Sequence, residues 1–120
     1  FEGTMKDPAN PEKRSEIKVT DEQVVQMVKD RSKKAQAPEP ILPKNTGFNS
    51  LDEAVNDFKK SRGEHIKYLK NSTEDLRNHV FQMPFGYIDG YQFLLFMAAH
   101  SNRHTQQMNE VKASTGFPAN

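Results

Sequence analysis

The residues from Tyr87 to Pro118 form the longest stretch of the chain that follows a single helical pattern. Apolar residues and histidines recur there at spacings of three and four, which is the pattern of one helix face. This stripe consists of Phe93, Met97, His100, His104, Met108 and Val111. Gly116 followed by Pro118 is typical of a helix end. We therefore predict one helix of about 27 residues, roughly 40 Å long, with its stripe facing a core.

His100 and His104 stand four residues apart on this stripe. That spacing places two side chains one turn apart on the same helix face, with Cβ atoms about 5–6 Å apart. Two imidazoles so placed can bind one metal ion. The alternative is a pair of core histidines, each with its own hydrogen-bond partner. A zincin site is excluded, because Ser101 follows the first histidine where that motif needs glutamate.

The overall composition excludes several classes of function. The chain has 120 residues, with 17 Lys and Arg against 16 Asp and Glu, a formal charge of +1. This balance argues against nucleic acid as the main partner, since phosphate binding favours a concentrated basic surface. Cysteine is absent, so disulfides and thiolate sites are excluded. The longest apolar run, Phe93 to Ala99, is too short to span a membrane, and the start does not resemble a signal peptide. We expect a soluble, cytoplasmic protein.

Residues 1–19 are polar and proline-containing, which predicts a connection. Thr20 then begins a helix, because Gln23 stands at the spacing of a capping box and Val19 and Val24 form a hydrophobic staple. We predict that this helix ends near Ala35, before two prolines.

Residues 36–49 contain three prolines and are predicted to form a second connection. Ser50 with Glu53 gives another capping box, so we predict a helix from Ser50 to about Leu69. His65 borders the apolar stripe of that helix and is either a solvated or hydrogen-bonded residue or part of a site.

A capped turn is predicted from Ser72 to Leu76, followed by His79 in an exposed connection. We see no strand pattern and no internal repeat. The expected fold class is all-α, with residues 1–120 in a single domain. Hydrophobic residues make up only 34% of the chain, which is low for a domain with its own core. The core would then be completed by residues outside this chain or by a second subunit.

The pattern FGYIDGYQFLLFMAAHSNRHTQQMNEV resembles the DinB-like superfamily of four-helix bundles. It carries H-x-x-R-H, followed by Gln106 or Gln107. The helix SLDEAVNDFKKSR and the acidic turn STEDL are also similar to that family. The resemblance implies a bundle that binds a divalent metal ion, nickel or zinc, through three histidines, of which His100 and His104 would be two.

The third histidine of the family lies in its second helix, in a pattern like W-S-x-x-E-x-x-x-H. This chain has no Trp and no His before His65. The resemblance therefore implies that the chain is the C-terminal portion of the domain. The third ligand and the first two helices are expected upstream of residue 1, or a second subunit completes the bundle.

Characterised members of the superfamily that this chain resembles include thiol-dependent transferases that use bacillithiol or mycothiol, and a maleylpyruvate isomerase. The resemblance thus implies a metal-dependent transferase or hydrolase that acts on a small molecule, with a low-molecular-weight thiol as a further cofactor. Arg103 would orient an anionic substrate or form a surface ion pair, and no catalytic residue is assigned. The alternative is a non-catalytic helical protein, a homodimer, whose histidines have structural roles.

Overall fold

The computed structural model describes residues 4–32, 36, 39, 42 and 47–118. The chain divides into two compact units, which are described separately below. The first unit combines Phe1–Lys34 with Asp75–Asn120, and the second is Ala35–Glu74. Most of the predicted connection 36–49 lies outside the described residues.

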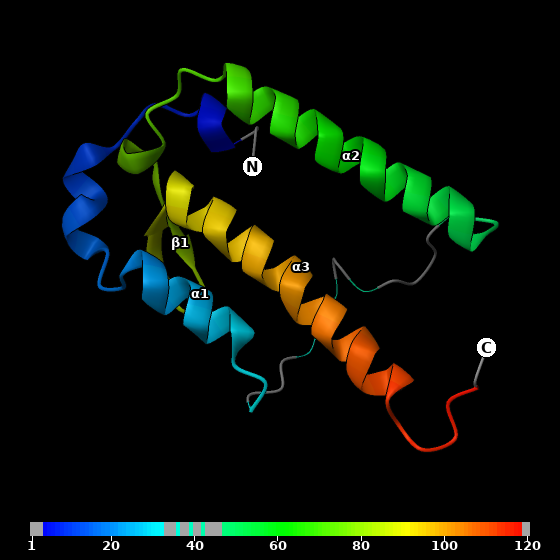
Figure 1. Cartoon of the computed structure of the whole chain (residues 1–120). Helices are drawn as coiled ribbons and strands as arrows, with labels where there is room; N and C mark the ends of the chain where they lie inside the picture. Colours follow the sequence, from blue (N-terminus) through cyan, green and yellow to red (C-terminus); the bar gives the residue numbers. More distant parts are fainter. Residues whose placement is uncertain (1–3, 33–35, 37–38, 40–41, 43–46, 119–120) are drawn as a thin grey trace. The chain divides into compact units, whose positions relative to one another are not determined.

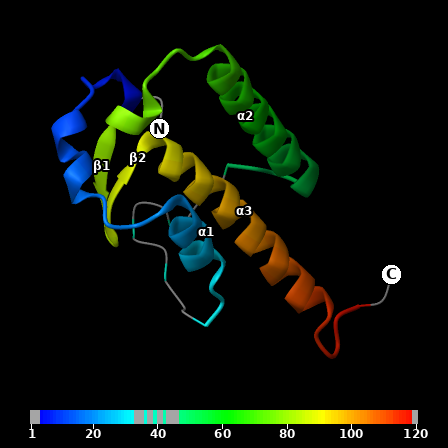
Figure 2. The same cartoon turned by 60° about the vertical axis from the view of Figure 1, so that its left-hand side comes forward.

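The first unit consists of helices around one small hairpin. In chain order its elements are η1 (Thr4–Lys6), η2 (Pro11–Glu16), α1 (Asp21–Lys29), η4 (Leu76–Asn78), β1 (Val80–Met83), β2 (Gly86–Asp89) and α3 (Gly90–Lys112). Helix α1 packs along α3, and the hairpin lies at the N-terminal end of α3 (Figures 1 and 2). The mostly helical structure confirms the predicted fold class.

The second unit contains one long helix, α2 (Leu51–Asn71). Ser50 is its N-cap, and its hydroxyl accepts a hydrogen bond from the Glu53 backbone N–H at 3.1 Å. The Glu53 carboxylate accepts from the N–H of Asn49 at 2.9 Å, one residue before the position expected in a capping box. The predicted start of this helix is confirmed, and its end lies two residues beyond the predicted Leu69.

Helix α1 begins as predicted and ends earlier than predicted. The capping box of Thr20 and Gln23 is present in both directions. The predicted end near Ala35 is wrong, because α1 ends at Lys29. The Asp30 carboxylate accepts hydrogen bonds from the backbone N–H and the hydroxyl of Ser32. Such a local side-chain turn competes with continued helix.

The prediction that the chain has no strand is wrong. β1 and β2 pair antiparallel, from Val80 opposite Asp89 to Met83 opposite Gly86. The two-residue turn between them includes Pro84, whose fixed φ suits a turn. Gly86 follows with φ of +128°, a conformation that favours glycine. Consequently the long helix starts at Gly90 instead of near Tyr87.

Residues before α1, predicted as a connection, contact this hairpin. The Asn10 amide pairs with the backbone of Val80 in both directions, donating to its carbonyl at 2.9 Å and accepting from its N–H at 2.8 Å. The side chain thus pairs the outward-facing backbone groups of Val80 at the start of β1, which an edge strand would otherwise leave unpaired. Met5 is buried next to Gly90. At Gly90 a Cβ atom would lie 2.9 Å from the Leu76 carbonyl oxygen, so the helix start approaches the preceding backbone too closely for a side chain.

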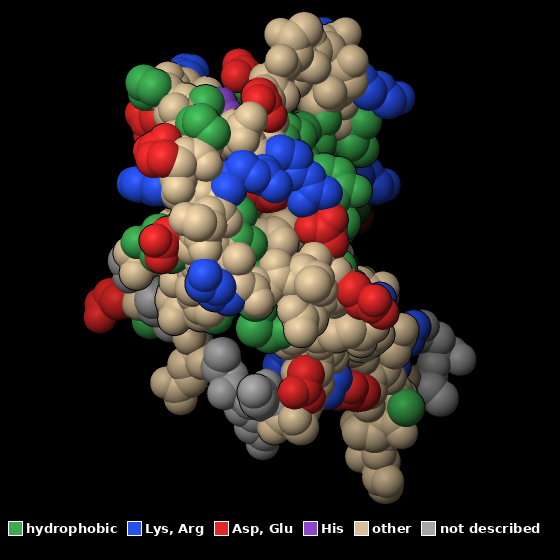
Figure 3. Space-filling model, turned by 90° about the vertical axis from the view of Figure 1, so that its left-hand side faces the viewer, with side chains coloured by type: hydrophobic (Ala, Val, Ile, Leu, Met, Phe, Trp, Pro, Cys, Tyr) green, Lys and Arg blue, Asp and Glu red, His purple; other side chains and the backbone are tan. Residues whose placement is uncertain are grey.

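Acidic and basic side chains lie next to each other on the face shown in Figure 3. Among the residues that the structure describes, no helix combines the length and apolar character needed to cross a membrane.

Candidate metal centre

One side of helix α3 packs against α1. Gln92 and Ala99 are buried on this side, and Arg103 and Glu110 continue it at spacings of four and seven. The Arg103 guanidinium donates to the carbonyl of Val28 at 3.1 Å and also to that of Asp30. These carbonyls end α1, where a cation is favourable. Because this side of α3 packs against α1, the side that carries the histidines does not face α1.

His100 and His104 project from the neighbouring side of α3, and both are exposed. The predicted burial of their stripe is therefore wrong for the described chain, since Met108 and Val111 are also 60% and 58% exposed. The physical reason is that α1 packs against the Ala99 side, about 100° around the helix from His100.

The two imidazoles of His100 and His104 face each other. Their Nε2 atoms are 2.9 Å apart, and their ring centroids are 4.5 Å apart with an angle of 86° between the planes. The other ring nitrogen of His104, Nδ1, lies 2.7 Å from Oε1 of Gln107. The His100 ring stacks on Phe96, with centroids 5.8 Å apart and planes 15° apart. Each ring is thus held by a neighbour on its own helix.

The spacing of the two Nε2 atoms suits a shared metal ion. Nitrogen ligands lie about 2.0–2.1 Å from zinc, so two ligands in adjacent coordination positions are roughly 2.9–3.4 Å apart. The observed separation is 2.9 Å. It is also a hydrogen-bond distance, so a metal ion would replace the proton that the two Nε2 atoms share. The donor set therefore fits a divalent ion such as zinc or nickel, both of which imidazole binds.

Among the residues that the structure describes, no third ligand joins this pair. Within the described ranges, no group of three or more His, Cys, Asp or Glu side chains is placed to hold a metal ion. His65 belongs to α2 in the second unit, where its Nδ1 is buried and has no hydrogen-bond partner among the described residues.

The prediction that His79 is exposed is wrong, because the residue is only 7% exposed. The His79 carbonyl accepts a hydrogen bond from the N–H of Gly90, so His79 lies next to the first residue of α3.

Sequence reasoning missed a polar cluster at the start of α3. Asp89, the N-cap of that helix, is 2% exposed and forms a capping box with Gln92. Its carboxylate also accepts from Arg77 at 3.1 Å, and Arg77 forms a second, two-bonded pair with Asp21 at 2.9 and 2.7 Å. The guanidinium lies over the Tyr91 ring, 4.1 Å from its centroid. The spacing of Asp89 and Gln92 was a readable capping signal, whereas Arg77 and Asp21 are 56 residues apart.

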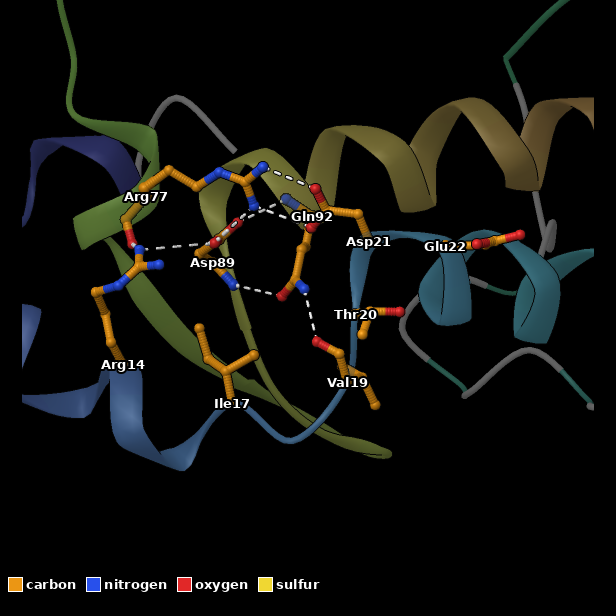
Figure 4. A pocket seen from close by; sticks show the side chains of 9 residues that line it. All are labelled: Arg14, Ile17, Val19, Thr20, Asp21, Glu22, Arg77, Asp89 and Gln92. Atoms are coloured by element: carbon orange, nitrogen blue, oxygen red, sulfur yellow. Dashed lines mark hydrogen bonds and ion pairs between the residues drawn. The ribbon is translucent and has the colours of Figure 1, made fainter.

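An open pocket of about 600 Å³ lies over this cluster (Figure 4). It is lined by Arg14, Ile17, Val19, Thr20, Asp21, Glu22, Arg77, Asp89 and Gln92. The polar groups in it bind one another: the Gln92 amide donates to the Val19 carbonyl at 2.9 Å, and Arg14 donates to the Arg77 carbonyl. The cluster thus ties η2, η4, β2, α1 and α3 together.

The pairing of Asp21 with Arg77 makes stability depend on pH. The hydrogen bond from Arg77 is the main cause that lowers the pKa of Asp21 below its usual value, and the same bond raises the pKa of Arg77. A carboxyl with a lowered pKa contributes stability that is complete above its unfolded pKa of about 3.9 and is lost as the pH falls through its folded pKa.

We therefore expect the free energy of unfolding to decrease as the pH falls below about 4, and Asp21→Asn to flatten this decrease. Because the Asp21 side chain is 41% exposed, solvent screening keeps the effect modest. Urea unfolding at a series of pH values measures it, with Asp57→Asn on α2 as the control. Equal slopes for Asp21→Asn and wild type would contradict the role of this pair.

The family model of the DinB superfamily matches residues 17–108, more than half of the chain. The chain belongs to the DinB superfamily. The matched range includes α1, α2, the hairpin and both His100 and His104. The comparisons with curated proteins and with solved structures gave no match.

Proposed function

We propose that this DinB superfamily protein binds a divalent metal ion, nickel or zinc, through Nε2 of His100 and Nε2 of His104. The observation that carries the proposal is the 2.9 Å separation of these two atoms on adjacent turns of α3. Their exposure leaves room for an ion to enter, and neutral imidazole is a common metal ligand at physiological pH.

The proposed activity is that of a metal-dependent transferase or hydrolase that uses a low-molecular-weight thiol. Two protein ligands leave coordination positions open, which a catalytic metal site requires. When bound, the metal would act as a Lewis acid that lowers the pKa of the thiol and holds its thiolate near an electrophile. His100 and His104 would hold the ion, and any further protein ligand would come from residues that the structure does not describe or from another chain.

The predicted substrate role of Arg103 stays a prediction. Its guanidinium donates to the carbonyls of Val28 and Asp30. An anionic substrate would have to share this group with the end of α1 or displace one of those carbonyls.

Metal analysis of the purified protein tests the proposal. We expect the wild type to retain zinc or nickel after removal of free metal, and His100→Ala and His104→Ala to lose it, because one imidazole alone is a weak ligand. Thr105→Ala is the matched control, since Thr105 is exposed on the same turn and its hydroxyl donates to the Ser101 carbonyl of its own helix. Unchanged metal content in both histidine variants would reject the proposed site.

A non-catalytic helical homodimer is the second candidate. It is favoured by apolar side chains that are more than half exposed in both units, Phe58 at 55%, Ile66 at 53%, Met108 at 60% and Val111 at 58%. Large apolar side chains exposed together on one helix are typical of interfaces, and each unit has such a pair on its own long helix. Sedimentation velocity tests this candidate, and a monomer over the full concentration range would reject it.

A further inference from the structure

Both ring nitrogens of His104 have a partner on α3. Nε2 lies 2.9 Å from Nε2 of His100, and Nδ1 lies 2.7 Å from the amide oxygen Oε1 of Gln107. Gln107 is one turn after His104 and is partly buried, whereas His104 itself is exposed. The amide therefore reaches the ring from the side opposite to the candidate metal position.

The chemistry of this contact decides which nitrogen of His104 carries the proton. A neutral imidazole has one N–H and one lone pair, and an amide oxygen can only accept a hydrogen bond. Nδ1 must therefore be the N–H donor to Gln107. The lone pair is then on Nε2, which accepts the 2.9 Å hydrogen bond from Nε2–H of His100 in the metal-free protein. A metal ligand needs that lone pair, and metal binding would displace the His100 proton.

From this contact we propose that Gln107 is a positioning residue that holds His104 in the Nδ1–H form and so presents Nε2 as the metal donor. The proposal rests on the proposed function, because it concerns the same site. Outer partners of this kind orient the ring and fix its tautomer, and their loss typically weakens metal binding about 10–100-fold.

The neighbouring glutamine provides a matched comparison. The sequence pattern left Gln106 and Gln107 equivalent, but in the structure the Gln106 amide donates to Asn102 at 3.0 Å on the exposed surface. Both residues are glutamines, and both lie on α3. Only Gln107 contacts a histidine that the proposed site uses.

The direct test is the tautomer of His104, measured by long-range ¹H–¹⁵N correlation NMR on the metal-free protein at a pH where the ring is neutral. We expect His104 to carry its proton on Nδ1 in the wild type and in Gln106→Met. In Gln107→Met we expect a shift toward the Nε2–H form that free histidine prefers. Gln107→Glu keeps an acceptor at this position and should restore the Nδ1–H form. A wild-type ring protonated on Nε2, or a tautomer unchanged in Gln107→Met, would overturn the proposal.

A zinc titration of the same proteins separates this proposal from the proposed function. We expect the dissociation constant to rise about 10–100-fold in Gln107→Met and to stay unchanged in Gln106→Met. Absence of zinc binding by a wild type that shows the Nδ1–H form would reject the metal site and leave the tautomer role intact. Tight zinc binding that Gln107→Met does not weaken would reject the role of Gln107 and leave the metal site intact.

Discussion

An Asp89→Ala variant is expected to unfold with a free energy about 2–4 kcal/mol lower than that of the wild type. The buried carboxylate caps α3 by accepting from the Gln92 N–H at 2.7 Å, and it pairs with Arg77 at 3.1 Å. Loss of an N-cap costs about 0.5–2 kcal/mol. Breaking a fully buried ion pair costs about 3–5 kcal/mol, but the Arg77 side chain is 43% exposed, which reduces that part.

Chemical denaturation measures this change, and Asp89→Ser divides it into two parts. Serine is a good N-cap but carries no charge, so this variant should keep the helix start and lose only the contribution of the ion pair. A change below about 0.5 kcal/mol for Asp89→Ala, the range of ordinary surface substitutions, would contradict the role assigned to the cluster.

Metal binding is expected to stabilise the folded protein strongly. A ligand that binds only the native state at 100 times its dissociation constant adds about 2.7 kcal/mol to the free energy of unfolding. For a chain of this size that corresponds to a rise in Tm on the order of 10 °C. Thermal unfolding with added zinc or nickel, and again with a chelator, measures the shift.

The shift should disappear in His100→Ala and persist in Thr105→Ala, because only the first removes a proposed ligand. A metal-dependent shift of equal size in His100→Ala would show that the ion binds elsewhere. Destabilisation of all the proteins by metal would indicate preferential binding to the unfolded chain.

Local sequence signals predicted the starts of α1 and α2, whereas the Asp89–Gln92 capping box at the start of α3 was missed. Thr20 with Gln23 and Ser50 with Glu53 identified two N-termini, because each cap bonds a backbone N–H three residues away. The spacing of His100 and His104 also predicted their shared face, since that depends only on helix periodicity.

The end of α1 and the hairpin depend on contacts between residues far apart in the sequence, which local signals do not reveal. The end of α1 is set partly by Arg103, which is 75 residues from Val28. The hairpin is supported by Asn10, which is 70 residues from Val80. Neither partner can be inferred from the short segments that they stabilise. The exposed position of the histidine stripe follows from the packing of α1 on the other side of α3, which apolar periodicity alone does not reveal.

The identity of the metal ligands is the point on which the proposed function depends. X-ray absorption spectroscopy of the zinc- or nickel-loaded protein at the metal edge counts the imidazole nitrogens bound to the ion. We predict at least two imidazole ligands, at about 2.0–2.1 Å for zinc, and one fewer in His104→Ala. A coordination shell without imidazole, or one unchanged in that variant, would contradict the proposal.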